Sequence, residues 1–146
     1  MIIKLKTGFT LIELLVVISI IGILISISLF GLQGARESSR DARRKSDLEL
    51  IRSGLEIYKS DCNIYPASLG SSLVGSGSPT SCAVANTYIS SVPKDPLDPN
   101  RLYPYSRPTT TTYILCASLE NPPSPAVDVT GCGSCGLTCN YKVANP

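Results

Sequence analysis

The chain has 146 residues and a formal net charge of +2, from 13 basic and 11 acidic residues, with no His and no Trp. This length accommodates one small globular domain beside a long helix, and excludes a second full core. The nearly balanced charge also differs from the strongly basic composition of dedicated nucleic-acid binders, so we predict no specific nucleic-acid partner.

The first element in chain order is an uncharged apolar segment. No residue from Leu14 to Leu32 is charged, and Ile, Leu and Val dominate, so a helix here is long enough to cross about 30 Å of hydrocarbon. A secretory signal peptide is the alternative, because Lys4 and Lys6 precede the run. The run is longer than a signal-peptide core, and Leu32-Gln33-Gly34-Ala35 is a poor cleavage site. We therefore favour a transmembrane helix over residues 9–34.

The segment after the span is polar and then amphipathic. Residues 36–45, called the neck below, are nearly all polar and predict a solvated helix. Within the neck, Glu37 and Asp41 have the helical spacing to pair with Arg40, Arg44 and Lys45.

An apolar stripe follows the neck at three- and four-residue steps. It consists of Leu48, Ile51, Leu55 and Tyr58, and the sequence suggests that Leu50 and Ile57 widen it. We expect this amphipathic helix to lay its apolar side on a sheet and to end between residues 61 and 66.

Short β segments are predicted over residues 87–92, 102–105 and 110–117. The Ser- and Gly-rich stretch 70–80 and the Pro-rich stretch 93–100 are predicted loops, and the tail 121–146 is expected to lack regular structure. The predicted fold class is α+β, with a long N-terminal helix packed on a small antiparallel sheet. The soluble domain would span residues 35–146, with a loop-rich, disulfide-stapled C-terminal region.

All six cysteines lie beyond the apolar segment, at Cys62, Cys82, Cys116, Cys132, Cys135 and Cys139. An even number in a small loop-rich domain indicates disulfides made in an oxidising compartment. Many pairings are open; we prefer Cys62 with Cys82, because it would tie the helix end to the following loop, and pairing of the other four among themselves.

Two alternatives use the same cysteines. Cys132, Cys135, Cys139 and Cys116 could hold zinc, since four thiolates close a tetrahedral site. The Cys132-Gly-Ser-Cys135 spacing also occurs in thiol redox centres. Either site would make the chain a membrane-anchored, Cys-rich domain with a metal-binding or thiol redox role, which is the alternative function. No His is available as a general base and no nucleophile motif occurs, so we predict no catalytic residue and no enzyme activity.

The cysteines and the flanking charges disagree about orientation. Five basic residues follow the span, against Lys4 and Lys6 before it: Arg36, Arg40, Arg43, Arg44 and Lys45. The positive-inside rule alone would keep the C-terminal domain in the cytoplasm. We give more weight to the cysteines and expect that domain outside the cytoplasm.

A single carboxylate stands at the start of the apolar helix. Gly8 and Phe9 precede Thr10-Leu11-Ile12-Glu13, and a carboxylate in such a helix usually has a partner. If the chain is cut after Gly8, Phe9 gains an α-amine, and Glu13 of one subunit can meet Phe9 of its neighbour in a staggered bundle. We expect this charge pair to set the register of assembly.

This stretch resembles the type IV prepilin family, which includes the pseudopilins of type II secretion. The likeness consists of a short basic leader ending in Gly8, Phe9 at the junction, Glu13 at the fifth mature position and the apolar helix through Gly22. It implies that prepilin peptidase removes residues 1–8 and methylates Phe9. It also implies a homo-oligomeric helical filament, an inner-membrane assembly platform, minor pilins, membrane lipid as surroundings, and a location in the inner membrane and then the periplasm or cell surface.

Later residues resemble the major pseudopilins: Asp-Cys-Asn-Ile-Tyr-Pro at 61–66, Val-Pro-Lys-Asp-Pro at 92–96 and Tyr-x-Tyr at 103–105. Many relatives carry a Pro where this chain has Phe30. Major pseudopilins often bind calcium in an acidic C-terminal loop, whereas Asp128 is the only acid between Glu120 and Pro146. A hard cation wants several oxygens, so we predict no cofactor; Asp95, Asp98 and Asp128 are the candidates if calcium binds.

Overall fold

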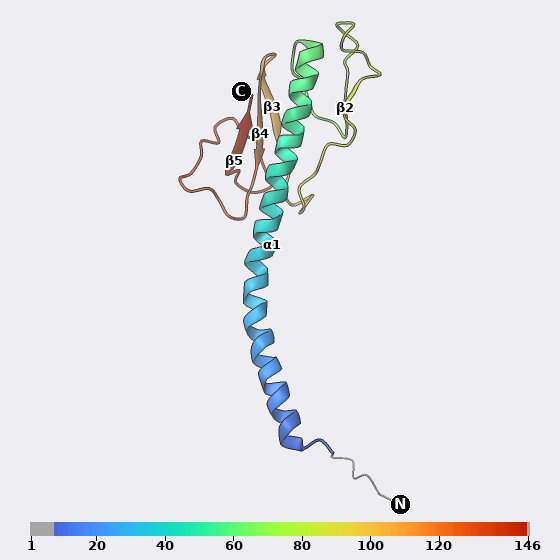
Figure 1. Ribbon diagram of the computed structural model, residues 1–146. Coiled ribbons are helices and arrows are strands. Elements are labelled where there is room, and N and C mark those ends of the chain that lie inside the picture. Colours follow the sequence, from blue (N-terminus) through green and yellow to red (C-terminus); the bar gives the residue numbers. More distant parts are fainter. Residues whose placement is uncertain (1–7, 146) are drawn as a thin grey trace, which may run out of the picture. The chain divides into compact units, whose positions relative to one another are not determined.

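The computed structural model describes residues 8–145, apart from the side chains at positions 29 and 30. Residues 1–7 of the predicted leader, with Lys4 and Lys6, and the side chain of Phe30 therefore lie outside the described residues. The elements are α1 (Leu11–Cys62), β1 (Leu73–Val74), β2 (Thr87–Ile89), β3 (Tyr105–Thr109), β4 (Thr112–Ala117) and β5 (Tyr141–Ala144) (Figure 1). The chain divides into two compact units, Met1–Arg36 and Glu37–Pro146, each described by itself.

The described part of the first unit is the start of α1. Among the described residues, α1 is the one helix long and apolar enough to cross a membrane, and none of its most apolar window is buried within the chain. The hydroxyls of Ser19 and Ser28 donate to the carbonyls of Leu15 and Leu24, at 2.8 and 2.9 Å. Because these polar groups are satisfied inside the helix, its surface suits a lipid environment.

The core of the second unit forms along the predicted stripe of α1. Leu48, Ile51 and Leu55 are fully buried and Tyr58 is 4% exposed, as the sequence predicted. They belong to the same buried cluster as Tyr113, Leu115 and Ala117 of β4.

The widening of the stripe by Leu50 and Ile57 is wrong. These side chains are 50% and 56% exposed. Each lies two positions from a buried residue of the stripe, and two positions turn a helix by about 200°, so both point away from the core.

Two antiparallel sheets accompany the helix. β1 pairs with β2, and β3, β4 and β5 form a sheet in that order. Leu115 is central in the second sheet, paired with Tyr105 on one side and Val143 on the other. The fold class of one long helix with small antiparallel sheets and a disulfide-stapled C-terminal region is confirmed.

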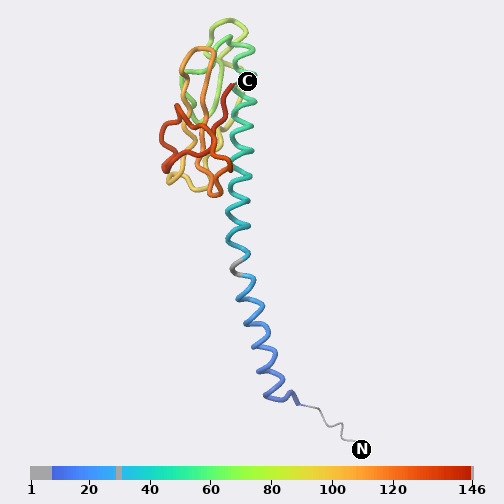
Figure 2. Tube along the Cα trace, turned by 90° about the vertical axis from the view of Figure 1, so that its left-hand side faces the viewer, coloured from blue at the N-terminus to red at the C-terminus, as the bar shows by residue number. Residues whose placement is uncertain are grey.

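The strand predictions need three corrections. The segment 102–105 contributes only Tyr105, because the strand continues to Thr109 and turns into β4. β1 lies inside the predicted loop 70–80. The tail is not devoid of regular structure, because β5 occupies Tyr141–Ala144; Figure 2 shows this last segment in red next to α1, where the Lys45 ammonium lies 5.8 Å from the Tyr141 ring centroid.

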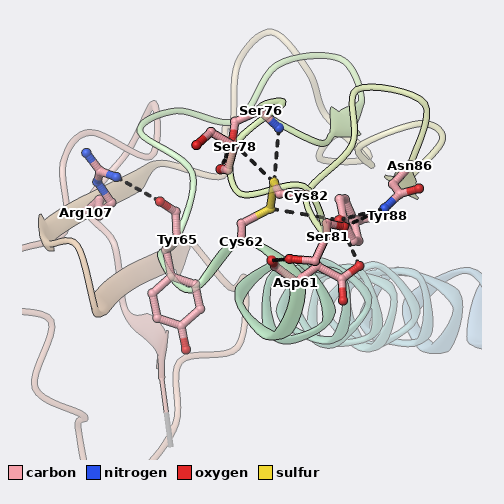
Figure 3. The surroundings of a disulfide bond; sticks show 10 residues. All are labelled: Asp61, Cys62, Tyr65, Ser76, Ser78, Ser81, Cys82, Asn86, Tyr88 and Arg107. Atoms are coloured by element: carbon pink, nitrogen blue, oxygen red, sulfur yellow. Dashed lines mark hydrogen bonds between the residues drawn. A yellow bond between two sulfur atoms is a disulfide. The ribbon is translucent and has the colours of Figure 1, made fainter.

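The end of α1 is fixed by a left-handed residue and a disulfide. Asn63 has φ 62° and its N–H donates to the Lys59 carbonyl at 2.9 Å, which is a common way to end a helix. Cys62 is bonded to Cys82 in the loop between β1 and β2. Figure 3 shows Tyr88 beside this bond, where its hydroxyl donates to Asp61 Oδ2 at 3.0 Å. The predicted helix end and the preferred Cys62–Cys82 pair are both present.

The other disulfides hold the tail. Cys116 of β4 is bonded to Cys132, and Cys135 to Cys139. Gly136, at φ 82°, lies so close to the 93–104 segment that an added Cβ would be 2.1 Å from the Asn100 carbonyl oxygen. The tail is therefore fastened both to the sheet and to the preceding loop.

The neck is helical and most of its residues are exposed, as predicted, but two of its charged side chains are buried. Arg44 is fully buried and Asp41 is 5% exposed. Arg44 Nε and Nη2 donate to the two carboxylate oxygens of Asp95, at 2.7 and 3.1 Å. Its Nη1 donates to Asp41 Oδ1 at 2.7 Å and to Glu120 Oε1 at 2.8 Å.

The same network reaches further along the helix and the chain. Arg40 donates to both oxygens of Glu120, and the Asp41 carboxylate accepts the backbone N–H groups of Glu120 and Asn121, at 2.9 and 2.8 Å. The predicted pair of Asp41 and Arg44 is present. Its burial was not predicted, because Asp95 and Glu120 lie far from the neck in sequence, where helical spacing cannot find them.

Candidate functional site

The candidate assembly site is the first turn of α1. Thr10 precedes the helix, and its backbone N–H and hydroxyl both donate to Glu13 Oε2, at 2.9 and 2.6 Å. In return, the Glu13 N–H donates to Thr10 Oγ1 at 3.3 Å. This reciprocal arrangement is a capping box, which satisfies two backbone donors that a helix start leaves free.

The capping box determines where the carboxylate of Glu13 lies. Both hydrogen bonds from Thr10 use Oε2, so the other oxygen can accept from a further donor. The surrounding surface is apolar and exposed: Phe9 is 80% exposed, and a shallow hollow there is lined by Phe9, Ile12, Glu13, Val16 and Val17. A negative group ringed by apolar side chains is suited to a cationic partner that is itself shielded from water.

Sequence reasoning identified Gly8, Phe9 and Glu13 but missed Thr10. The signal was present, because Thr three residues before Glu is the sequence signature of a capping box. The structure adds that, in the uncut chain, Glu13 is bonded to its own helix start.

All six cysteines of the described residues are in disulfides. Cys132 and Cys135 bond to other partners and not to each other. In this oxidised form they present neither the Cys-x-x-Cys disulfide of a redox centre nor a set of thiolates for zinc.

The three calcium candidates each face a cation of the protein. Asp95 is bound by Arg44, Asp98 Oδ2 lies 3.5 Å from Lys94 Nζ, and Asp128 Oδ2 lies 2.7 Å from Lys142 Nζ. The Lys142 ammonium and the Thr130 donors hold the pKa of Asp128 well below its usual range. Within residues 8–145, no group of three or more acidic or Cys side chains is arranged to hold a metal ion.

The Tyr-x-Tyr pair packs on the domain. The Tyr103 hydroxyl donates to Asp47 Oδ2 at 3.0 Å, and the Tyr105 hydroxyl to the Pro66 carbonyl at 2.7 Å. Both rings pack against the core cluster, so these hydroxyls are engaged within the domain.

Comparison with known proteins identifies the family to which the chain is related. A family profile described as "Prokaryotic N-terminal methylation motif" matches residues 3–29. Type II secretion system core protein G of Vibrio cholerae is 32% identical over 118 residues, which cover 77% of this chain and 81% of that protein.

Further matches are shorter. Core protein G of Aeromonas hydrophila is 41% identical over 61 residues, and that of Pectobacterium carotovorum is 40% identical over 62. These matches cover 42% of this chain and only 43% and 40% of the two relatives. No solved structure matches the chain significantly.

The methylation motif, the apolar helix with its single capped carboxylate and the small helix-and-sheet domain define the class of type IV prepilin-like proteins. Within that class, the chain belongs to the family of type II secretion system core protein G, the major pseudopilins.

Proposed function

We propose that the chain is a structural subunit of a type II secretion pseudopilus, or of a closely related type IV pilus-like filament. The observation that carries this proposal is the N-terminal motif, Gly8-Phe9 followed by Glu13 and an uncharged helix, in a chain with core protein G relatives. The role is structural and not enzymatic, and it requires no cofactor.

Processing would divide the chain into three parts. Prepilin peptidase cuts after Gly8 and methylates the new amine of Phe9, which removes the leader 1–8. Residues 9–34 then serve as the transmembrane and polymerisation helix, and residues 35–146 form the globular domain outside the cytoplasm. The subunit leaves the inner membrane through an assembly platform, with minor pilins, and enters a periplasmic or surface filament.

Glu13 would change partner during assembly. In the uncut chain, its carboxylate accepts from Thr10; after cleavage, the Phe9 ammonium of a neighbouring copy can approach the same group. At about 4 Å and an effective dielectric near 20, that attraction amounts to about 4 kcal/mol before desolvation is subtracted. Desolvation removes much of this gain, so the pair selects register more than it adds stability.

The processing step can be tested on the protein from its native host. N-terminal sequencing and intact mass should give a chain that starts at Phe9 with one added methyl group. A mature chain that starts at Met1 contradicts the proposed function, and a start near Arg36 indicates ordinary secretion instead.

A further inference from the structure

A hollow of about 540 Å³ lies on the surface of the second unit, where the neck meets three other segments of the domain. It is lined by Glu37 of α1, Arg101 of the loop before β3, residues 118–120 after β4, and residues 137–138 of the tail. Its volume is in the range of ordinary ligand sites. The walls carry one cation, Arg101, and two carboxylates, Glu37 and Glu120.

Arg101 supplies hydrogen-bond donors to this hollow. Its Nη1 donates to the Ser118 carbonyl at 2.6 Å, and its side chain makes no other hydrogen bond within residues 8–145. A guanidinium has five N–H donors in a fixed fork. The bond to Ser118 therefore holds the group in place and leaves donors for a ligand. A forked cation of this kind suits the oxygens of a phosphate.

Glu37 supplies a carboxylate that the fold leaves unengaged. Arg40, one helical turn further on, donates to both oxygens of Glu120, and Arg44 donates to Glu120 as well. Among the described residues, no hydrogen bond or ion pair engages the Glu37 carboxylate. The charge of Glu120 is thus compensated, and the hollow presents one free cation and one free carboxylate.

The chain itself keeps this hollow close to the membrane surface. Glu37 comes three residues after Gly34, where the predicted span ends, and three residues reach at most about 11 Å in any conformation. The headgroup layer on each side of the hydrocarbon is about 5 to 7 Å thick. Glu37 therefore stays within or next to the headgroups for as long as the subunit remains in the membrane.

We propose that this hollow, the Glu37–Arg101 site, binds the headgroup of a zwitterionic phospholipid with a primary amine, such as phosphatidylethanolamine, in the outer leaflet of the inner membrane. The lipid phosphate accepts hydrogen bonds from Arg101, and the lipid ammonium donates to Glu37. Leu137, which is 57% exposed and lines the same hollow, contacts the apolar part of the lipid next to the headgroup.

The charges of the site select this class of lipid. One cation and one carboxylate match a zwitterion, whereas an anionic headgroup would leave Glu37 without a partner. The inference rests on the proposed function, because it requires a span in the membrane and a domain outside the cytoplasm. It adds that the domain is held on the leaflet before assembly, and that entry into the filament breaks this contact.

The site can be tested with the full-length chain in lipid nanodiscs that contain equal amounts of phosphatidylethanolamine and phosphatidylcholine with the same acyl chains. A photo-reactive phenylalanine at Leu137 should give at least about threefold more adducts with the ethanolamine lipid, because the quaternary ammonium of choline has no N–H to donate. The same probe at Val84, which is 69% exposed and does not line the hollow, should show no preference. Equal adducts at Leu137 overturn the proposal.

Substitutions in the chain with the Leu137 probe separate the two charges of the site. Glu37→Gln should abolish the preference for ethanolamine and keep the wild-type unfolding midpoint, because the fold does not bind this carboxylate. Arg101→Gln should lower the adducts with both lipids. Lys94→Gln is the matched control, because Lys94 is 76% exposed and does not line the hollow; it should change neither. An unchanged preference in Glu37→Gln overturns the proposal.

Two further outcomes are distinguishable. In discs that also contain phosphatidylglycerol, a preference of the Leu137 probe for this anionic lipid would show a simple anion site and overturn the proposal. A chain that does not insert into the discs, or that starts near Arg36 in its host, contradicts the proposed function. A chain that starts at Phe9 and inserts, but shows no lipid preference at Leu137, contradicts the Glu37–Arg101 site alone.

Discussion

At the scale of single residues, Glu13 serves two structural roles that one substitution can separate. Glu13→Gln retains an oxygen that accepts from Thr10, so the cap of α1 persists, but it loses the charge that would attract the Phe9 amine of a neighbour. We expect this variant to be cleaved and inserted, and to yield few or misregistered filaments. Glu13→Asp, which keeps the charge on a shorter side chain, should be intermediate.

Filament abundance and helical symmetry, measured by electron microscopy, show whether the Glu13 charge is needed for assembly. Thr10→Ala is the complementary control, because it removes the cap and keeps the charge. Wild-type symmetry and abundance for Glu13→Gln would rule out the charge pair and leave the family assignment intact.

Arg44 is a fully buried cation that three carboxylates of the second unit share. Arg44→Met would leave the carboxylates of Asp41, Asp95 and Glu120 without their common cation. Loss of one partner of a buried ion pair typically costs about 3 to 5 kcal/mol. Urea unfolding of the oxidised soluble domain should show a loss of this size, whereas Arg43→Met, at an exposed position 3.9 Å from Asp47, should change stability by less than about 1 kcal/mol.

The same network predicts how stability depends on pH. Hydrogen bonds from Arg40, and then those from Arg44, lower the pKa of Glu120 from 4.5 to about 2. Because the folded state binds this proton more weakly than the unfolded state, its contribution is complete above pH 4.5 and is lost as the pH falls toward about 2. Glu120→Gln should be less stable than wild type at pH 7 and should lose less stability across this acidic window; an unchanged slope would contradict the assignment.

At the scale of elements, the sequence predicts what local spacing determines. The stripe Leu48, Ile51 and Leu55 recurs at helical steps and is buried, and the helix ends at Cys62 as the following turn residues indicate. Leu50 and Ile57 show the limit of this reasoning, because apolar character alone does not say which face meets the sheet.

Elements that depend on contacts with residues far away in the sequence are not predicted by local spacing. β5 has four residues in a Pro- and Cys-rich tail, and it forms because β4 offers its free edge. Asp41 and Arg44 look like a solvated i,i+3 pair until the fold brings Asp95 and Glu120 to them. For the assembly site, the sequence motif identifies Gly8, Phe9 and Glu13. The contact of Glu13 with Thr10 could also have been predicted, from the capping-box spacing.

At the scale of the whole molecule, the buried network bears on the conflict between the flanking charges and the cysteines. Five basic residues follow the span in the sequence, but Arg40 and Arg44 are paired with Glu120, Asp41 and Asp95 in the folded domain. Once the domain has folded, much of this positive charge is therefore compensated by the domain itself. The positive-inside rule acts on the chain during insertion, before such pairing exists, so the pairing gives these basic residues a role in the folded domain and does not itself decide the orientation.

The second unit should fold without the first. Its core, its ion network and its three disulfides all lie between Glu37 and Pro146, so a chain beginning at Gly34 and exported to an oxidising compartment should be a soluble monomer. Closing the 20-residue separation of Cys62 and Cys82 should stabilise it by about 3 kcal/mol. Sedimentation gives the oligomeric state, and intact mass under denaturing conditions should rise by two hydrogen atoms for each of the three disulfides on reduction. Aggregation of the oxidised domain would mean that its fold needs the apolar helix. An unchanged mass on reduction would mean that the cysteines are free thiols and that the domain folds without disulfides.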